Sequence, residues 1–234
     1  MGLGIKTYLF HKWNELSGVY PPQFEGHYVE WRARRIRAIL NHFGADFFDN
    51  KNMVELGAGF GAIGAFFAIL GSKVTCVEGR IANTRKIRKR YPFVDAITHD
   101  LNLGMPCIDT KCDILLHLGV LYHLRNPEES LRLSCKDCEH LILETECSDS
   151  DDPYFVSSVS EDARGYDQAI DGVGSRPSPA LVERILTSEG MLFERITDAR
   201  CNSGIHHYDW PIKNTKTASY GQRRMWFVKK NRLA

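Results

Sequence analysis

The chain has 234 residues, of which 43% are hydrophobic and 25% charged, with a formal net charge of +1. This length suits one large domain, or a domain with an extension, and allows a sizeable buried core. The near-neutral charge gives no overall attraction to nucleic acid or to a membrane surface. Polyanionic partners are therefore disfavoured, although the net charge does not exclude a local basic patch.

Secretion and membrane insertion are also disfavoured. Residues 1–18 lack the apolar core and small-residue cleavage site of a signal peptide, and the longest apolar run, 62–71, is too short to span a bilayer. The seven cysteines are irregularly spaced, which is typical of reduced thiols. Cys135 and Cys138 form a CxxC pair without a second pair at zinc-finger spacing, so we expect a turn there and no metal site. A cytoplasmic protein without a membrane partner is expected.

The first predicted helix covers residues 23–43. Apolar residues such as Trp31, Ile36 and Leu40 recur there at helical spacing, and Gly44 follows as a stop signal. We assign residues 1–45 to an N-terminal helical extension and residues 46–234 to the main domain.

From residue 46 onward, apolar β-branched segments alternate with helical segments. The predicted strands are 52–57, 73–79, 95–100, 112–119, 140–147, 191–199 and 223–230. The predicted helices between them are 61–71, 82–91, 127–135 and 178–190. This alternation indicates βαβ units, and therefore an α/β fold with a Rossmann-like, mostly parallel seven-stranded sheet, helices on both faces and an antiparallel last strand.

Two segments interrupt this alternation. Residues 148–178 are acidic and rich in turn residues, with weak periodicity, and residues 201–222 are rich in His, Tyr, Trp and Asp. Irregular loops of this length in a compact domain are usually functional or mobile. We expect both to be insertions on the side where a substrate binds.

The stretch MVELGAGFGAIG, residues 53–64, fits two nucleotide-binding patterns. From Gly57 it is an acidic residue followed by G-x-G-x-G, and from Gly59 it is the dinucleotide pattern G-x-G-x-x-G. Both place a glycine turn and a helix N-terminus beside a ligand. Glu55 separates them, because a carboxylate just before the turn repels a pyrophosphate and suits a ligand that carries an ammonium and a sulfonium. Glu78 and Asp100 end the next two strands and can accept hydrogen bonds from ribose hydroxyls and an adenine amino group.

These segments together resemble the class I S-adenosylmethionine (SAM)-dependent methyltransferases. The resemblance covers VELGAGFG, the acids in VTCVEG and AITHD, and CDILLHLGVLYHL, roughly residues 50–147, and the last two predicted strands fit the same family. It implies SAM as the cofactor, with the glycines near the methionine part, Glu78 on the ribose and Asp100 on the adenine. The residues implied to bind SAM are Glu55, Gly57, Gly59, Gly61, Glu78, Asp100, Leu101, His117 and Leu118. Gly64 then becomes a packing residue.

A shorter similarity concerns LGVLYHLRNP, residues 118–127, which resembles the GVLYH segment of the wobble-uridine tRNA carboxymethyltransferases. In that subfamily the tyrosine matching Tyr122 helps to recognise a carboxylated cofactor. We therefore count Tyr122 among the substrate-binding residues. A tRNA or other nucleic-acid methyltransferase stays the nearest alternative, although the basic segment 84–92 is better explained as a solvated helix face.

A hydroxyl acceptor must lose a proton during methyl transfer, and histidine is the usual base for this step. His123 follows the fourth predicted strand, on the rim where open α/β sheets bind ligands, so it is our first candidate. His117 lies inside an apolar strand and fits a structural role better.

The segment HHYDW supplies the remaining acceptor-side candidates. Aromatic faces stack on sugars and bases, while Asp and His bond hydroxyl groups. We expect His207 and Asp209 to act in catalysis, and His206, Tyr208 and Trp210 to bind the acceptor. The alternative is a packed loop anchored by Trp210. A divalent metal on Asp151, Asp152 and Asp209 is the less favoured option, because clustered loop acids are more often solvated.

The predicted function is SAM-dependent O-methylation of a sugar, a glycan or a similar small-molecule acceptor that carries a hydroxyl group. Besides the nucleic-acid methyltransferase, two alternatives stay open. One is an NAD-dependent oxidoreductase built on Gly59, Gly61 and Gly64, and the other is a protein that binds the cofactor without turnover.

Overall fold

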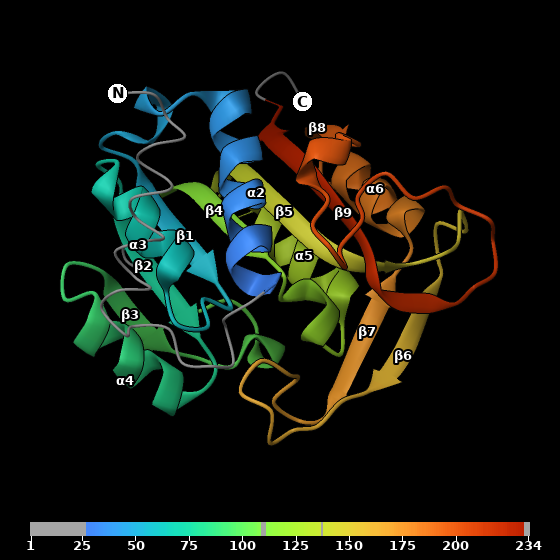
Figure 1. Cartoon of the computed structure of the whole chain (residues 1–234), viewed down its shortest axis with the longest axis horizontal. Helices are drawn as coiled ribbons and strands as arrows, with labels where there is room; N and C mark the ends of the chain where they lie inside the picture. The colour runs from blue at the N-terminus through green and yellow to red at the C-terminus, as the bar shows by residue number, and fades with distance from the viewer. Residues whose placement is uncertain (1–26, 109–110, 137, 232–234) are drawn as a thin grey trace.

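The computed structural model describes residues 27–108, 111–136 and 138–231. Residues 1–26, which include segment 1–18 and the start of the predicted first helix, lie outside the described residues. The main sheet has seven strands in the order β3-β2-β1-β4-β5-β9-β8 (Figure 1). Their bounds are β1 Asn52–Leu56, β2 Lys73–Glu78, β3 Asp95–Thr98, β4 Cys112–Leu118, β5 Cys138–Ser148, β8 Met191–Ile196 and β9 Ala218–Lys230.

The pairing of these strands confirms the predicted fold class. The first five strands pair in parallel, whereas β9 runs antiparallel to both β5 and β8. Parallel strands need crossover connections, and the helices between them supply these.

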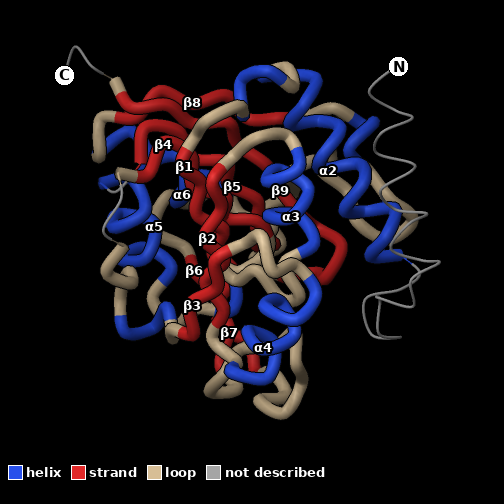
Figure 2. Tube along the Cα trace, turned by 90° about the vertical axis from the view of Figure 1, so that its left-hand side faces the viewer, coloured by secondary structure: helices blue, strands red, loops and turns tan. Residues whose placement is uncertain are grey.

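Helices cover both faces of the sheet (Figure 2). The helices are α2 His27–Phe43, α3 Ala62–Ile69, α4 Ile81–Arg90, α5 Pro127–Lys136 and α6 Pro179–Ser188. One hydrophobic cluster joins α2, α3 and α4 to the sheet, and a second joins α5 and α6 to its other face. Ser178 caps α6 by accepting a hydrogen bond from the Leu181 amide, and Pro179 follows at the first turn.

Helix α2 belongs to the core. Ile36 and Ile39 are fully buried in the first cluster, together with residues of β4, β5 and β9. The boundary expected between 1–45 and 46–234 therefore separates segments that share one hydrophobic core. No helix in the described part of the chain is long and apolar enough to cross a membrane.

The segment 148–178 is more regular than the sequence predicts. It contains an antiparallel two-stranded ribbon, β6 (Val156–Ser160) paired with β7 (Val173–Pro177), joined by a loop, 161–172. We missed these strands because their sequences, VSSVS and VGSRP, carry little apolar alternation. Polar contacts hold the ribbon to the domain instead: the Ser148 hydroxyl donates a hydrogen bond to the Arg176 carbonyl and accepts one from the Ser157 hydroxyl.

The second insertion is shorter than predicted. Strand β9 begins at Ala218, within the segment 201–222 that we expected to be a loop. The added residues, ASYGQ, lack the apolar pattern of a strand, but they extend β9 to a pairing of Ala218 with Ser148 across a bulge.

Candidate active site

An open cavity lies at the carboxyl ends of β1, β2 and β4, where open α/β sheets bind ligands. Seven of the nine residues predicted to bind a cofactor line it, namely Glu55, Gly57, Gly59, Glu78, Asp100, Leu101 and Leu118. The other two do not. Gly61 caps the start of α3, and His117 is fully buried in β4, where burial lowers its pKa to about 4.

The glycine turn after β1 brings backbone very close to its neighbours. Gly57 has a φ of +64°, and a Cβ added there would lie 2.5 Å from side-chain carbons of Val120. A Cβ on Gly64 would lie 2.7 Å from Glu55 Oε2 and 2.9 Å from Cys76 Sγ. Gly64 is thus a packing residue, and helix α3 lies directly against β1 and β2.

Glu55 of β1 bonds to the first turn of α3. Its Oε2 accepts a hydrogen bond of 2.9 Å from the Gly64 amide and one of 3.4 Å from Cys76 Sγ. Burial raises the pKa of Glu55 to about 7, although these hydrogen bonds and the charges of Arg35 and Arg32 act to lower it. A buried acid poised near neutrality lies beside the glycine turn.

The raised pKa makes a prediction about stability. Between the ordinary pKa of 4.5 and about 7, the folded state binds this proton more tightly than the unfolded state, so the contribution of Glu55 is lost as the pH rises. We therefore compare the free energy of unfolding of Glu55→Gln with that of wild type at two pH values. The difference, variant minus wild type, should be up to about 3 kcal/mol more positive at pH 8 than at about pH 4.5. Urea unfolding at both pH values measures this change. An unchanged difference between the two proteins would contradict it.

Glu78 braces the same turn from β2. Its Oε2 accepts a hydrogen bond of 2.8 Å from the Gly59 amide, and its Oε1 accepts from the Arg80 amide and from Asn83 Nδ2. Burial raises its pKa. Asp100, after β3, caps the short helix Leu101–Leu103 by accepting a hydrogen bond of 2.9 Å from the Asn102 amide. Three carboxylates therefore line one cavity at the ends of adjacent strands.

His123 ends the short helix Leu121–His123 after β4 and also lines the cavity. Its Nδ1 lies 2.6 Å from Oε2 of Glu161, a residue of the ribbon segment that the sequence did not single out. Burial opposes ionisation of Glu161, but hydrogen bonds from His123 and Ala169 and the charge of Arg176 outweigh it and lower the pKa to about 2. An ionised carboxylate only accepts hydrogen bonds, so Nδ1 carries the proton.

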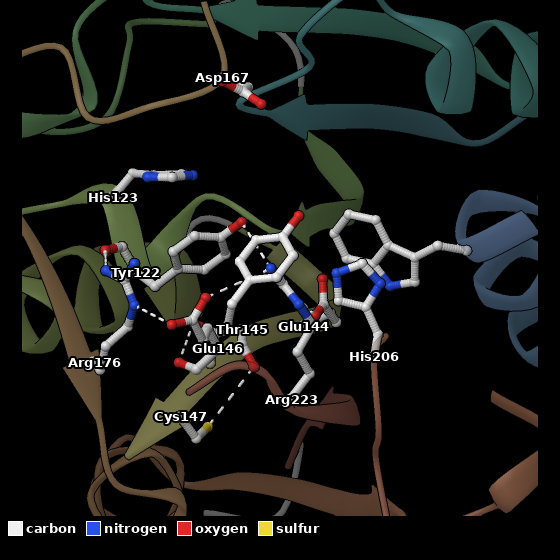
Figure 3. Close-up of polar contacts among 12 residues, drawn as sticks. Tyr122, His123, Glu144, Thr145, Glu146, Cys147, Asp167, Arg176, His206 and Arg223 are labelled. Carbon is white, nitrogen blue, oxygen red and sulfur yellow. Dashed lines mark hydrogen bonds and ion pairs between the residues drawn. The ribbon is translucent and has the colours of Figure 1, made fainter. Parts of the chain in front are cut away.

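The other ring nitrogen of His123, Nε2, forms no hydrogen bond with any described residue, and the side chain stays 13% exposed at the cavity. In the neutral imidazole, the lone pair of Nε2 thus has no partner among the described residues. Figure 3 shows the His123 ring near Tyr122, and Asp167 on a separate segment; His123, Tyr122 and Asp167 all line the cavity. No sequence signal identified Glu161, because one acid in an acidic insertion does not show which residue it will meet.

Tyr122 lines the cavity and belongs to a buried polar network. Its hydroxyl accepts a hydrogen bond of 3.1 Å from Arg223 Nη2, and burial raises its pKa to about 12. Arg223 is completely buried and pairs with Glu144 at 3.2 Å. Arg35 of α2 pairs with the other oxygen of Glu144. We did not predict this network from the sequence.

The HHYDW segment is arranged differently from our prediction. Inward residues alternate with outward ones: His206, Tyr208 and Trp210 are buried, and His207 and Asp209 are exposed. None of the five lines the cavity with His123. Their contacts are structural, because an extended segment beside β9 turns every second side chain inward.

Individual contacts in this segment support that conclusion. Tyr208 accepts a hydrogen bond of 2.6 Å from Trp31 Nε1, and Trp210 donates one of 3.1 Å to the Arg223 carbonyl. His206 stacks on Trp31 at 4.1 Å. Asp209 accepts from Asn202, far from a metal-binding arrangement with Asp151 and Asp152, and the described residues contain no group of three or more possible metal ligands.

Two other segments complete the cavity wall: helix α2, which the sequence did not place at the site, and part of the insertion 148–178, which we expected on the substrate side. Helix α2 contributes Tyr28, Trp31, Arg32 and Arg35, and the loop 161–172 contributes Tyr166, Asp167, Gln168, Ala169 and Ile170. The Tyr28 hydroxyl donates to Asp167 Oδ2 at 3.0 Å and so joins the two segments. The Arg80 guanidinium holds the loop by donating to the carbonyls of Gly165 and Gln168.

The chain was compared with family models, curated proteins and solved structures, and only solved structures are similar to it. No family model and no curated protein matches the chain. Among solved structures, the N-terminal domain of EvdMO1 with S-adenosylhomocysteine (SAH) bound superimposes with a TM-score of 0.65 at 20% identity, over 86% of this chain and 81% of that one. The same domain in the presence of SAH and D-fucose gives 0.66 at 19% identity, over 99% and 100%.

A SAM-dependent methyltransferase from Mesorhizobium loti superimposes with a TM-score of 0.60 at 13% identity, over 86% of this chain and 98% of that one. The strand order with an antiparallel β9 between β5 and β8 agrees with this likeness. The chain has the fold of the class I SAM-dependent methyltransferases.

Proposed function

We propose that this protein binds SAM and transfers its methyl group to a hydroxyl group of a sugar or glycan. The chemistry of the cavity fits the cofactor, because three carboxylates match its three donor regions. Glu55 would meet the ammonium, Glu78 the ribose hydroxyls and Asp100 the adenine amino group. The related EvdMO1 domain holds SAH, which is what SAM becomes after methyl transfer.

The observation that carries the reaction type is the His123–Glu161 pair at the cavity. When bound, SAM supplies an electrophilic methyl group. His123 Nε2 would take the proton of the acceptor hydroxyl as its oxygen forms the new bond to carbon and the sulfur–carbon bond breaks. Glu161 holds the tautomer that leaves Nε2 free and stabilises the imidazolium that forms.

The acceptor side of the cavity fits a polyhydroxylated ring. Tyr28 offers a partly exposed aromatic ring, and Asp167 and Gln168 offer hydrogen-bonding groups. The presence of D-fucose in the EvdMO1 crystals supports a sugar acceptor. A cytoplasmic location belongs to the same proposal and is supported by seven free cysteine thiols.

The site geometry argues against the NAD-dependent alternative. The Gly64 amide, in the first turn of α3, donates to Glu55, so a carboxyl group lies against the N-terminus of this helix. A carboxylate at that helix N-terminus repels an anionic ligand. No observation on the cavity favours a nucleic-acid acceptor over a sugar.

Calorimetric titration of the purified protein with SAH and with NAD tests the cofactor. We expect binding of SAH and no binding of NAD, and the reverse result would refute the proposal. Methyl transfer from labelled SAM is then measured on D-fucose and its methyl glycosides, on glycan extracts, on tRNA and on protein. Label in the sugar or glycan fractions supports the acceptor class, whereas label only in tRNA replaces it with the nucleic-acid alternative.

A further inference from the structure

Arg176 of strand β7 lies at the junction of the two groups that make up the proposed base. Its Nη1 donates a hydrogen bond of 2.9 Å to Glu161 Oε1 and another of 2.9 Å to the carbonyl of Tyr122, the residue before His123. One nitrogen therefore fixes both the carboxylate that holds the imidazole and the backbone that carries it. We infer that Arg176 is the positioning residue of His123, an inference that rests on the proposed function for its catalytic meaning.

The rest of the Arg176 side chain is anchored from the opposite side. Its Nε donates a hydrogen bond of 2.6 Å to Glu146 Oε1, and its guanidinium carbon lies 4.8 Å from the centre of the Tyr122 ring. Figure 3 shows Glu146 between Arg176 and Arg223. Because the guanidinium is planar and held at both ends, its Nη1 has one orientation.

Gly174 provides the space for this junction. A Cβ added at Gly174 would lie 2.2 Å from Glu161 Oε1, 2.7 Å from Arg176 Nη1 and 2.7 Å from the Tyr122 carbonyl oxygen. These are the same three atoms that the two hydrogen bonds join. Any larger residue at this position must displace at least one of them.

The junction explains the place of the ribbon in the molecule. The side chains of Glu161 and Arg176 are 3% and 8% exposed, and both come from a segment inserted after β5. Glu161 Oε2 also accepts a hydrogen bond of 2.7 Å from the Ala169 amide. The same oxygen therefore bonds both His123 and the loop 161–172, which lines the acceptor side of the cavity. The inserted segment thus positions the proposed base, and the orientation of His123 depends on that loop.

The tautomer of His123 tests the inference without any acceptor. Protein labelled with ¹⁵N in histidine is studied by long-range ¹H–¹⁵N correlation at a pH where the rings are neutral, with His123→Gln to assign the signal. We expect the proton on Nδ1 in wild type, and loss of this single tautomer in Arg176→Met and Gly174→Ala. Arg176→Lys should also lose the single tautomer, because an ammonium group cannot reproduce the planar set of donors of the guanidinium.

Arg184→Met is the matched control. Arg184 also ties the inserted segment to the domain, through the Pro153 carbonyl and Glu128, but it does not contact Glu161 or Tyr122. It should keep the wild-type tautomer. With an acceptor in hand, Arg176→Met should lower kcat on the order of a hundredfold with the Kd for SAH unchanged. Gly174→Ala keeps every charge and so provides the test if Arg176→Met does not fold.

An unchanged Nδ1–H tautomer in folded Arg176→Met or Gly174→Ala would overturn the inference and leave the proposed function intact. Loss of the tautomer in Arg184→Met to the same extent would also overturn it, because the effect would then belong to ribbon anchoring in general. Loss of the tautomer in Arg176→Met and Gly174→Ala alone would establish the positioning role, even if the proposed methyl transfer failed its own acceptor assay.

Discussion

His123→Gln is expected to lower kcat for methyl transfer by roughly 10² to 10⁴, the usual contribution of a general base. The Kd for SAH should not change, because the carboxylates proposed to hold the cofactor lie in other segments, in β1, at the end of β2 and after β3. Single-turnover transfer from labelled SAM and calorimetry with SAH measure the two quantities separately.

Glu161→Gln provides a graded comparison. The imidazole stays in place, but a neutral amide can donate as well as accept, so the tautomer is no longer fixed. We expect a loss of activity smaller than or equal to that of His123→Gln. His42→Gln, far along α2 and paired with Glu194, serves as the control and should keep full activity. Full activity in His123→Gln would remove the base from the mechanism.

Arg223→Met is expected to lower the free energy of unfolding by about 3–5 kcal/mol, because it leaves buried carboxylate charge uncompensated. The network contains three arginines and three glutamates, namely Arg35, Arg176, Arg223, Glu144, Glu146 and Glu161. Arg223 is fully buried and also lies 4.4 Å from the Trp31 ring and 4.7 Å from the Tyr122 ring. Its loss removes charge balance and packing together.

A double variant separates these two contributions. Adding Glu144→Gln to Arg223→Met leaves two arginines and two glutamates, so a large part of the lost stability should return. Arg200→Met, which breaks an exposed pair with Asp198, should leave unfolding unchanged within error. Urea denaturation of the four proteins measures these effects. If Arg223→Met lowers the free energy of unfolding no more than Arg200→Met does, the buried carboxylates do not need the charge of Arg223.

The elements that the sequence predicted well carry strong local patterns. Strands such as 112–119 are short apolar runs, and helices such as 178–190 carry both a cap and a glycine stop, so their positions follow from neighbouring residues alone. The ribbon strands β6 and β7 carry no such pattern. They pair with each other, and Ser148 of β5 bonds to Ser157 of β6 and to the Arg176 carbonyl of β7.

The HHYDW segment shows why residue type is a weaker guide than position. His, Tyr, Asp and Trp are common in sugar-binding pockets, and we assigned His206 to Trp210 to one on that ground. In the structure this segment lies beside β9. Its buried side chains contact Trp31 and the backbone of Arg223 instead of a ligand cavity. Residues of α2 and the loop 161–172 line the cavity instead.

By itself, the sequence determined the α/β sheet, the glycine turn and the acids that end β1, β2 and β3, because each depends on residues close together in the chain. It also indicated His123, because this residue lies shortly after the predicted strand 112–119. Only the tertiary structure decided that Glu161 meets His123 and that Arg176 and Gly174 hold this pair. These contacts join residues 15 to 54 positions apart, and the pattern along a chain does not specify which distant side chains pack together.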